Sequence, residues 1–228
     1  MRCPQASSIR PIRRGASARL ASLVVAVLLL SYAVYAAAFI YHTSFRVGGA
    51  RYFCLFDDAM ISMRYARHLA EGHGLVWNPG GERVQGFTAP LWTLYMSLWH
   101  LLPIPERLMS LPIQATGGLC MLLLLLTLRR LALRLSSGSR LAALSAMALT
   151  AFYLPLNNWA LQGMEVGLLA LLLAAAVSAA NLTAADERAR FTGLPYLLLG
   201  VACLVRLDAC LWLATVTAFG ALTDPANR

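Results

Sequence analysis

The sequence predicts an all-α fold, a transmembrane bundle of about five or six helices with an outer loop that carries helices at the membrane surface. Of the 228 residues, 59% are apolar and only 13% are charged. An average soluble domain has about a quarter of its residues charged. All 19 basic residues behind the net charge of +9 are arginines, and they cluster beside long uncharged stretches. This composition excludes an ordinary soluble domain, a disordered tail and a small disulfide-rich protein.

Several stretches of the chain contain no Asp, Glu, Lys or Arg. Their length is close to the roughly 17–25 residues that a helix needs to cross a bilayer. A last stretch, 191–223, is interrupted only by Arg206 and Asp208. A helix in a soluble core would carry polar residues on one face, whereas 121–126 and 168–177 are entirely apolar. The uncharged stretches are Leu20–Tyr41, Phe87–Pro105, Leu108–Leu128, Leu141–Met164 and Val166–Ala185.

The placement of the arginines predicts the orientation of the chain. Residues 1–19 contain five arginines and residues 129–140 contain four, and neither segment contains an acidic residue. By the positive-inside rule, both segments are expected on the cytoplasmic side. The long loop 42–107 has nearly balanced charges and is then placed outside the membrane.

An odd number of crossings must therefore separate the outer loop from residues 129–140, so one of the two apolar stretches between them does not cross. The weaker stretch is 87–105, which contains His100 and ends at two prolines. We expect it to form an interfacial or re-entrant helix. Segment 157–165 then lies outside and 183–190 inside. The expected spans are 20–41, 108–128, 141–157 and 166–183, with one or two more within 193–222.

The N-terminus has a second interpretation. Arg13 and Arg14, an apolar run and the small residues 36–38 also imitate a secretory signal peptide. The run is longer than a usual signal core and further spans follow, which favours an uncleaved first span. The chain is then divided into a basic cytoplasmic segment 1–19, a transmembrane module 20–222 and a tail 223–228.

The outer loop contains the longest polar stretch of the chain, residues 56–88. Asp57 and Asp58 precede apolar residues at helical spacing, with charged residues on another side, and Gly72 follows. This pattern predicts an amphipathic helix at the membrane surface. Carboxylates at a helix N-terminus commonly act as caps, but a cap needs only one acid. The other can serve as a general base toward a hydroxyl group, and the sequence leaves open which of the two does so.

Three charged residues interrupt or border apolar sequence. Glu165 lies at the predicted outer end of a span, and Arg206 and Asp208 lie inside the last stretch. Ions in a membrane are costly and usually face a cavity or each other. Residues two apart on a helix point in different directions, so Arg206 and Asp208 are each expected to have another partner. Arg206 is a candidate phosphate ligand, because guanidinium binds phosphate oxygens in pairs. A structural ion pair is the alternative.

Several short motifs follow one another along the chain. They are Asp57-Asp58, RYARHL at 64–69, GHGLVWNPG at 72–80, GERVQGFT at 81–88, PLWT at 90–93, GME at 163–165 and VRLD at 205–208. This order resembles the GT-C class of membrane glycosyltransferases, closest to bacterial relatives of the mycobacterial arabinofuranosyltransferases. More distantly, it is similar to aminoarabinose transferases, protein O-mannosyltransferases and oligosaccharyltransferases. The resemblance covers nearly the whole chain.

The resemblance implies transfer of a sugar from a polyprenyl-phosphate carrier to a glycan, lipid or protein acceptor of the cell envelope. The reaction is expected on the outer face of the bacterial inner (plasma) membrane. The resemblance also implies that Asp57 or Asp58 is the general base, that Glu165 is the second acidic position of the site, and that Arg206 lies near the carrier phosphate.

Further substrate contacts are expected from Arg64, Arg67 and Asp208. The two arginines are alternative sources of positive charge for the leaving phosphate, which needs charge stabilisation more than a strong acid. Carboxylate oxygens are also ligands for divalent metals. Because the similar enzymes differ in their need for metal, no metal or other cofactor is assigned.

The chain departs from the family pattern at Leu207, where the family usually has proline, and in its length, which is much shorter than that of most members. The short length supports one alternative, a catalytically inactive truncated protein that acts as a scaffold or partner subunit. A small transporter or flippase is a further alternative, but no internal repeat is present. Nucleic-acid binding is not expected, because the arginines cluster at membrane borders.

Overall fold

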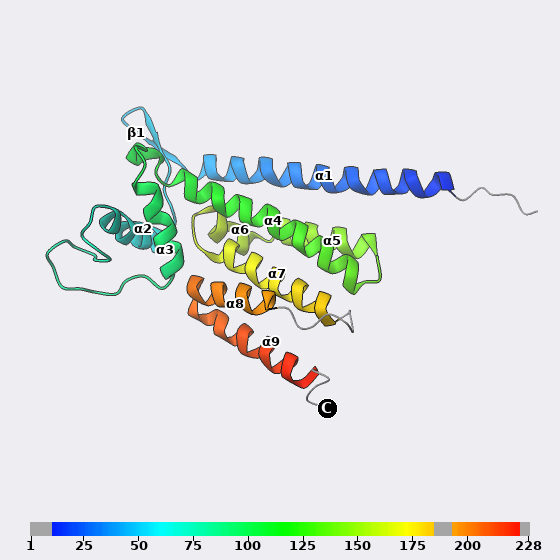
Figure 1. Ribbon diagram of the computed structural model, residues 1–228. Coiled ribbons are helices and arrows are strands. Elements are labelled where there is room, and N and C mark those ends of the chain that lie inside the picture. The colour runs from blue at the N-terminus through cyan, green and yellow to red at the C-terminus, as the bar shows by residue number, and fades with distance from the viewer. Residues whose placement is uncertain (1–10, 185–192, 224–228) are drawn as a thin grey trace, which may run out of the picture.

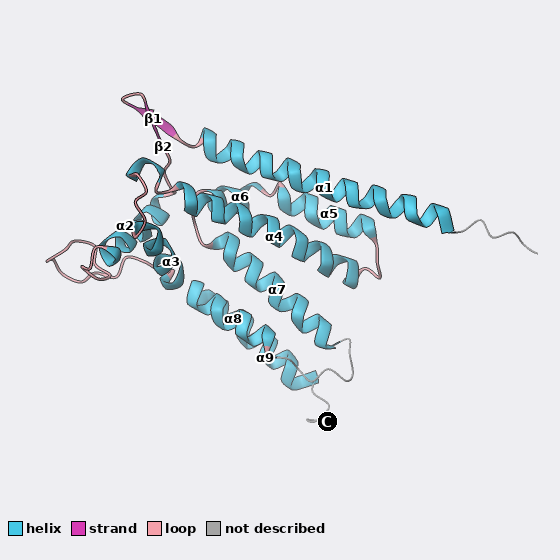
Figure 2. Cartoon of the chain, turned by 45° about the horizontal axis from the view of Figure 1, so that its top comes forward, coloured by secondary structure: helices cyan, strands magenta, loops and turns pink. Residues whose placement is uncertain are grey.

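The computed structural model describes residues 11–184 and 193–223, most of which lie in helices (Figures 1 and 2). A long first helix leads into a short antiparallel hairpin, in which Arg46 lies opposite Arg51. Two short helices follow the hairpin, and the later helices form a bundle with the first. In chain order the elements are α1 (Pro11–His42), β1 (Phe45–Val47), β2 (Ala50–Tyr52), α2 (Asp57–Ala70), α3 (Pro90–His100), η1 (Glu106–Leu108), α4 (Leu111–Leu135), α5 (Arg140–Ala151), α6 (Leu154–Leu161), α7 (Val166–Ala184), α8 (Leu194–Val205), η2 (Leu207–Ala209) and α9 (Cys210–Thr223).

Within residues 11–184 and 193–223, two helices are long and apolar enough to cross a membrane. They cover Arg19–His42, within α1, and Glu106–Leu135, which joins η1 to α4. A third crossing exists if α6 and α7, between which the chain bends by 118°, act as one broken span. Helices α5, α8 and α9 are apolar but shorter. The predicted all-α membrane bundle is confirmed, with fewer full-length spans among the described residues than the sequence led us to expect.

The single span expected over 141–157 is wrong, because the chain breaks there into two helices. Helix α5 ends at Ala151, and Pro155 lies in the first turn of α6, where its missing N–H breaks no helical hydrogen bond. A helix of 12 residues such as α5 is about 18 Å long, against a hydrocarbon core of about 30 Å. The stretch 193–222 divides in the same way at Arg206, whose backbone is extended.

Helix α4 forms the centre of the bundle and packs against α1, α5, α6 and α7. Gly117 of α4 permits a close approach to α6, because a Cβ atom at this position would clash with the carbonyl oxygen of Ala160. Tyr32 of α1 is also buried against α6 and donates a hydrogen bond to Asn157 Oδ1 at 2.9 Å. Helices α7, α8 and α9 then follow one another outward from α4 (Figure 1).

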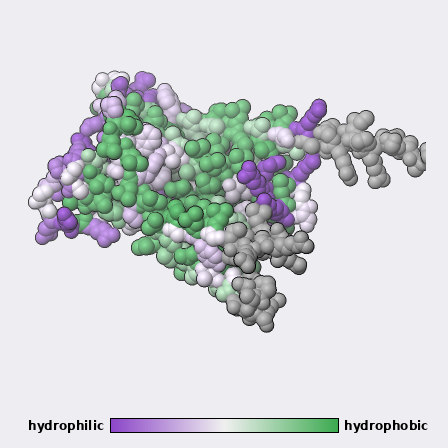
Figure 3. All heavy atoms as spheres, viewed as in Figure 1, coloured by the Kyte–Doolittle hydropathy of each residue, from purple (hydrophilic) through white to green (hydrophobic). Residues whose placement is uncertain are grey.

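The two ends of the bundle differ in what they carry. Helices α2 and α3 lie together at one end, near the hairpin, and the turn between α4 and α5 lies at the other end (Figure 1). Hydrophobic atoms cover the middle of the molecule, whereas hydrophilic atoms gather at its two ends (Figure 3). Met63 of α2 packs with Trp92 and Met96 of α3 in one apolar cluster. With 11 residues, α3 is too short to cross a bilayer, which agrees with the non-crossing helix expected within 87–105.

Candidate active site

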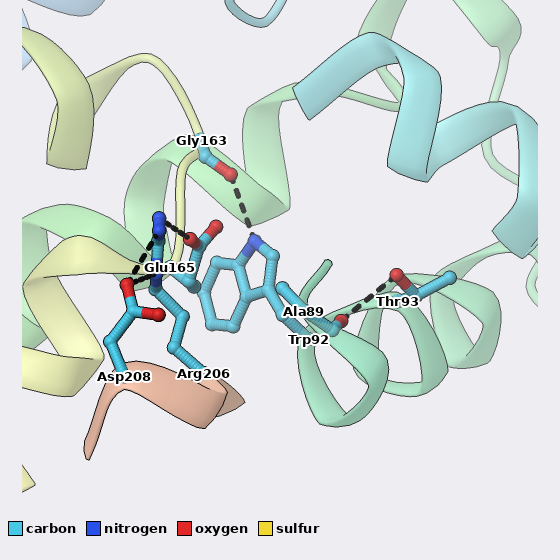
Figure 4. Close-up of polar contacts among 7 residues, drawn as sticks. All are labelled: Ala89, Trp92, Thr93, Gly163, Glu165, Arg206 and Asp208. Atoms are coloured by element: carbon cyan, nitrogen blue, oxygen red, sulfur yellow. Dashed lines mark hydrogen bonds and ion pairs between the residues drawn. The ribbon is translucent and has the colours of Figure 1, made fainter. Parts of the chain in front are cut away.

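A tight turn after α6, residues 162–165, joins three parts of the chain that are far apart in sequence. The backbone N–H of Phe56, immediately before α2, donates to the carbonyl oxygen of Gln162 at 2.9 Å. The indole Nε1 of Trp92 in α3 donates to the carbonyl oxygen of Gly163, also at 2.9 Å (Figure 4). The turn therefore brings the first residues of α2 and α3 to the place where α7 begins.

Gly163 is the residue that this turn requires. Its φ angle is +89°, a conformation that residues with a Cβ atom rarely adopt. A Cβ atom at this position would also lie 2.6 Å from Cδ2 of Leu55. The neighbouring Met164 packs into the apolar cluster formed by α2 and α3. The backbone conformation and the packing thus act together to hold the turn against α2.

The guanidinium group of Arg206 lies between two carboxylates directly after α8 (Figure 4). Its Nη1 donates to Glu165 Oε1 at 3.0 Å, and its Nη2 donates to Asp208 Oδ2 at 2.9 Å. The side chain of Glu165 is 6% exposed, that of Arg206 32% and that of Asp208 73%. The three groups therefore form a row that leads from the interior to the solvent, and in their ionised forms they leave one excess negative charge.

The expectation that Arg206 and Asp208 point in different directions is wrong. It assumed a continuous helix, whereas Arg206 has φ −149° and ψ 133° and separates α8 from the short 3-10 helix that follows. The extended backbone lets the two side chains meet. The other part of the expectation is confirmed for Arg206 alone, which has a further partner, Glu165, 41 positions earlier in the chain. Among the described residues, the side chain of Asp208 pairs only with Arg206.

Asp57 and Asp58 are the first two residues of α2, and both are exposed. The N-cap position belongs to Phe56, and neither carboxylate makes a side-chain cap there. Asp57 Oδ1 instead accepts a hydrogen bond from the backbone N–H of Asp58 at 3.0 Å. The helix dipole stabilises negative charge at this end. Within the described part of the chain, neither aspartate forms an ion pair with Arg206.

The two aspartates lie on different faces of α2. Met60 and Arg64, three and seven positions after Asp57, line a cavity of about 720 Å³ beside the helix. Residues three and seven apart share one face of a helix, so Asp57 belongs to the cavity face. Asp58 instead shares a face with Tyr65, which is buried and donates to the Val84 carbonyl oxygen at 2.6 Å.

The cavity on the Asp57 face is amphipathic. Its walls come from the hairpin, α2, the end of α3 and the segment before α4. They combine aromatic and methionine side chains with charged ones. The lining residues are Phe45, Tyr52, Phe53, Cys54, Met60, Met63, Arg64, Arg67, His68, Glu71, His100, Leu102, Ile104, Glu106, Met109 and Ser110.

Arg64 already has partners within the chain. Its Nε donates to the Trp77 carbonyl oxygen at 3.0 Å, and its Nη2 donates to Asn78 Oδ1 at 2.7 Å. The guanidinium also lies 4.2 Å from the centre of the Trp77 ring. Arg64 therefore holds the loop after α2 against the helix.

Arg67 is also engaged. It pairs with Glu71, four residues further along the chain, at 2.8 Å, and with Glu106 at 3.2 Å. The hydrogen bond from the Arg67 guanidinium lowers the pKa of Glu71 below its usual value. The positive charge of Arg67 is thus balanced by two carboxylates, as that of Arg206 is.

Among the described residues, no three His, Cys, Asp or Glu side chains cluster closely enough to hold a metal ion.

Trp92 is a site residue that the sequence did not single out. It belonged to the PLWT motif, but nothing in the sequence indicated that its indole N–H would reach Gly163, 71 positions away. Gln114 was missed as well. Its side chain is buried within the apolar first turns of α4 and donates to the Cys54 carbonyl oxygen at 3.1 Å. A glutamine inside an uncharged stretch was the available signal.

The chain is similar to a known glycosyltransferase over part of its length. It is 35% identical over 116 residues to the "Terminal beta-(1->2)-arabinofuranosyltransferase" of Mycobacterium tuberculosis (strain ATCC 25618 / H37Rv). This alignment covers 49% of the chain but only 18% of the mycobacterial protein. No family model matches the chain, and no solved structure matches it. The similarity supports a relationship to membrane glycosyltransferases, in agreement with the resemblance of the motifs.

Proposed function

We propose that the chain is the catalytic module of a membrane glycosyltransferase, which transfers a sugar from a polyprenyl-phosphate carrier to a cell-envelope acceptor. One observation carries the proposal. The turn 162–165 joins the start of α2, with its exposed aspartates, to the Glu165–Arg206–Asp208 row at one end of an apolar bundle. A base and a phosphate-binding cation at a membrane border are what such a transfer needs. The partial similarity to an arabinofuranosyltransferase supports the same reaction class.

Asp57 is the base in this proposal. Its carboxylate takes the proton of the acceptor hydroxyl, and the hydroxyl oxygen forms a bond to the anomeric carbon of the donor sugar. The bond from that carbon to the carrier phosphate breaks, the configuration inverts, and polyprenyl phosphate leaves with the electron pair. Asp57 is preferred over Asp58 because it shares a helix face with Met60 and Arg64, which line the cavity.

Arg206 stabilises the departing phosphate. As paired, it is neutralised by its two carboxylates, so an anion can bind only if one of them gives way. Asp208 is the partner that yields, because its side chain is 73% exposed and regains water on release. Glu165 stays in place, because its side chain is 6% exposed and would lose its only described ion pair inside the protein. Glu165 is therefore a positioning residue for the guanidinium.

The apolar surface of the bundle suits the polyprenyl tail and the surrounding bilayer. We propose that the N-terminus lies in the cytoplasm of a bacterial cell and that α2, α3 and the 162–165 turn face the outside of the inner membrane. The nine arginines of segments 1–19 and 129–140 support this orientation through the positive-inside rule.

The test is a transfer assay in membranes with a labelled polyprenyl-phosphate sugar. We expect Asp57→Asn to lower the transfer rate by about 10²–10⁴-fold, the usual contribution of a general base. Asp58→Asn is the matched control, with the same change one residue away, and should lose far less. Full activity in both variants and in the double variant would overturn the base assignment. Binding of the labelled donor without any turnover by the unaltered protein would instead favour a scaffold role.

A further inference from the structure

A second cavity lies at the opposite end of the bundle, between α1, α4 and α5. Its volume is about 190 Å³. Gln114 marks the candidate-active-site end of α4, and Arg129 is 15 positions further along the same helix. At 1.5 Å per residue these positions are about 22 Å apart along the helix axis. The second cavity is therefore separate from the candidate active site.

Both arginines and apolar residues line this cavity. Arg129 of α4 and Arg140 of α5 both border it, and none of its lining residues is acidic. Val25 of α1 and Leu133 of α4 form part of the apolar wall, and Ala21 of α1 keeps the space open because its side chain is small. A ligand that complements these residues would carry a negatively charged group next to a hydrocarbon chain.

The first turn of α5 adds to the positive potential. Arg140 is the first residue of this 12-residue helix, and Ser139 caps it by accepting a hydrogen bond from the Ala142 N–H. The N-terminus of a helix carries partial positive charge that favours anions. Gly138, with a φ angle of +90°, lines the cavity without any side chain. Two arginines and the N-terminus of α5 thus border the same opening between helices.

We propose that this cavity binds the phosphate of an anionic phospholipid from the surrounding membrane. Guanidinium groups bind phosphate oxygens in pairs, and basic pockets between transmembrane helices on the cytoplasmic side are suited to anionic headgroups. Leu23 and Val24 of α1, next to the lining residue Val25, are apolar and exposed, which provides a surface for the acyl chains beside the cavity. The bound lipid would tie α5 to α1 and α4 at this end. The inference is independent of the proposed transfer reaction.

The experiment measures lipid binding to the purified full chain in a neutral detergent. Native mass spectrometry compares dioctanoyl-phosphatidylglycerol with dioctanoyl-phosphatidylcholine, which has no net charge. We expect preferential binding of the glycerol lipid, and a loss of about tenfold or more in affinity for the Arg129→Gln, Arg140→Gln double variant. Arg130→Gln is the matched control, because Arg130 is at the same end and exposed but does not line the cavity.

A third variant keeps the test decisive if removal of both arginines disturbs folding. Ala21→Leu fills the cavity, leaves both charges in place and should also abolish the preference. Equal binding of the two lipids by the unaltered protein would overturn the proposal. So would an equal loss in Arg130→Gln, which would indicate diffuse attraction to basic residues. Competition by inorganic phosphate at the lipid's own concentration would also overturn it, because it would identify a site for free phosphate.

Discussion

The acidic side chains near the 162–165 turn are held in two different ways. Asp57 and Asp58 are exposed at the start of α2, and among the described residues their carboxylates take part only in a local hydrogen bond, from the Asp58 N–H to Asp57 Oδ1. Glu165 is buried and paired with a guanidinium. A group that has to accept a proton and meet a substrate needs access, whereas a group that orients a cation needs a fixed position. We therefore assign proton transfer to the aspartates of α2 and charge stabilisation to the Glu165–Arg206–Asp208 row.

The largest expected effect on stability comes from removing the buried member of the row. Glu165→Ala leaves Arg206 with a single, exposed partner, and breaking a buried ion pair costs about 3–5 kcal/mol. Because Arg206 is itself about a third exposed, we expect a loss at the lower end of this range, about 3 kcal/mol in the free energy of unfolding. Denaturant unfolding in detergent measures it.

Asp208→Ala is the matched control for that change. It removes the other partner of the same guanidinium, but at a side chain that is 73% exposed. We expect a stability loss below about 1 kcal/mol, as for surface ion pairs. If the two variants lost equal stability, the distinction between a fixed and a yielding carboxylate would be wrong.

A smaller effect is expected where the two regions are joined. Gly163→Ala forces a residue with a Cβ atom into a φ of +89° and against Leu55, at a cost of about 1–3 kcal/mol. Gly80→Ala is the control, because Gly80 has a similar φ of +79° with open space around it. We expect Gly163→Ala to lower both stability and transfer rate, and Gly80→Ala to leave transfer unchanged. Equal transfer rates in the two variants would show that the turn does not position the site.

The smallest effect is a pH dependence on the outer face of α2. The Arg67 hydrogen bond lowers the pKa of Glu71 from its usual 4.5. A carboxyl group whose pKa is lower in the folded state stabilises the fold above its unfolded pKa and loses that contribution as the pH falls through the folded value. The stability difference between the unaltered protein and Glu71→Gln should thus be small and constant near neutral pH. In pH-dependent unfolding curves the difference should shrink as the pH falls below the usual pKa of 4.5, and it should vanish once the folded carboxyl group is itself protonated. A difference that grew on acidification would contradict the pairing.

Helix boundaries set by neighbouring residues were predictable from the sequence. Helix α2 begins at its aspartates and ends before Gly72, whose φ of +84° stops it. The division of the 141–157 stretch was missed, because hydropathy alone gave no weight to Pro155. The pairing of Arg206 with Asp208 was missed because a helix was assumed where the backbone is extended.

Contacts between distant parts of the chain had no signal in a single sequence. The motif order and the arginine placement put Glu165 on the same side as the aspartates, but the hydrogen bonds that join them depend on the three-dimensional packing. The Trp92 bond to Gly163 spans 71 positions, and the Phe56 N–H reaches the Gln162 carbonyl oxygen only because α6 and α7 bend sharply between them. The types of side chain in the sequence indicated the chemistry of the candidate site, but its geometry became visible only with the fold of the 162–165 turn.

The central claim is that Asp57 and Arg206 act on the same transferring sugar phosphate. A double-mutant cycle tests it most directly, with transfer rates measured for Asp57→Asn, for Arg206→Lys and for both together. The lysine keeps the positive charge but cannot form the bidentate hydrogen bonds of a guanidinium group. Residues that act as one unit are strongly non-additive. We predict that the double variant transfers at nearly the rate of the slower single variant. A rate reduced by the full product of the two separate losses, or an Asp57→Asn variant that is fully active, would contradict the account.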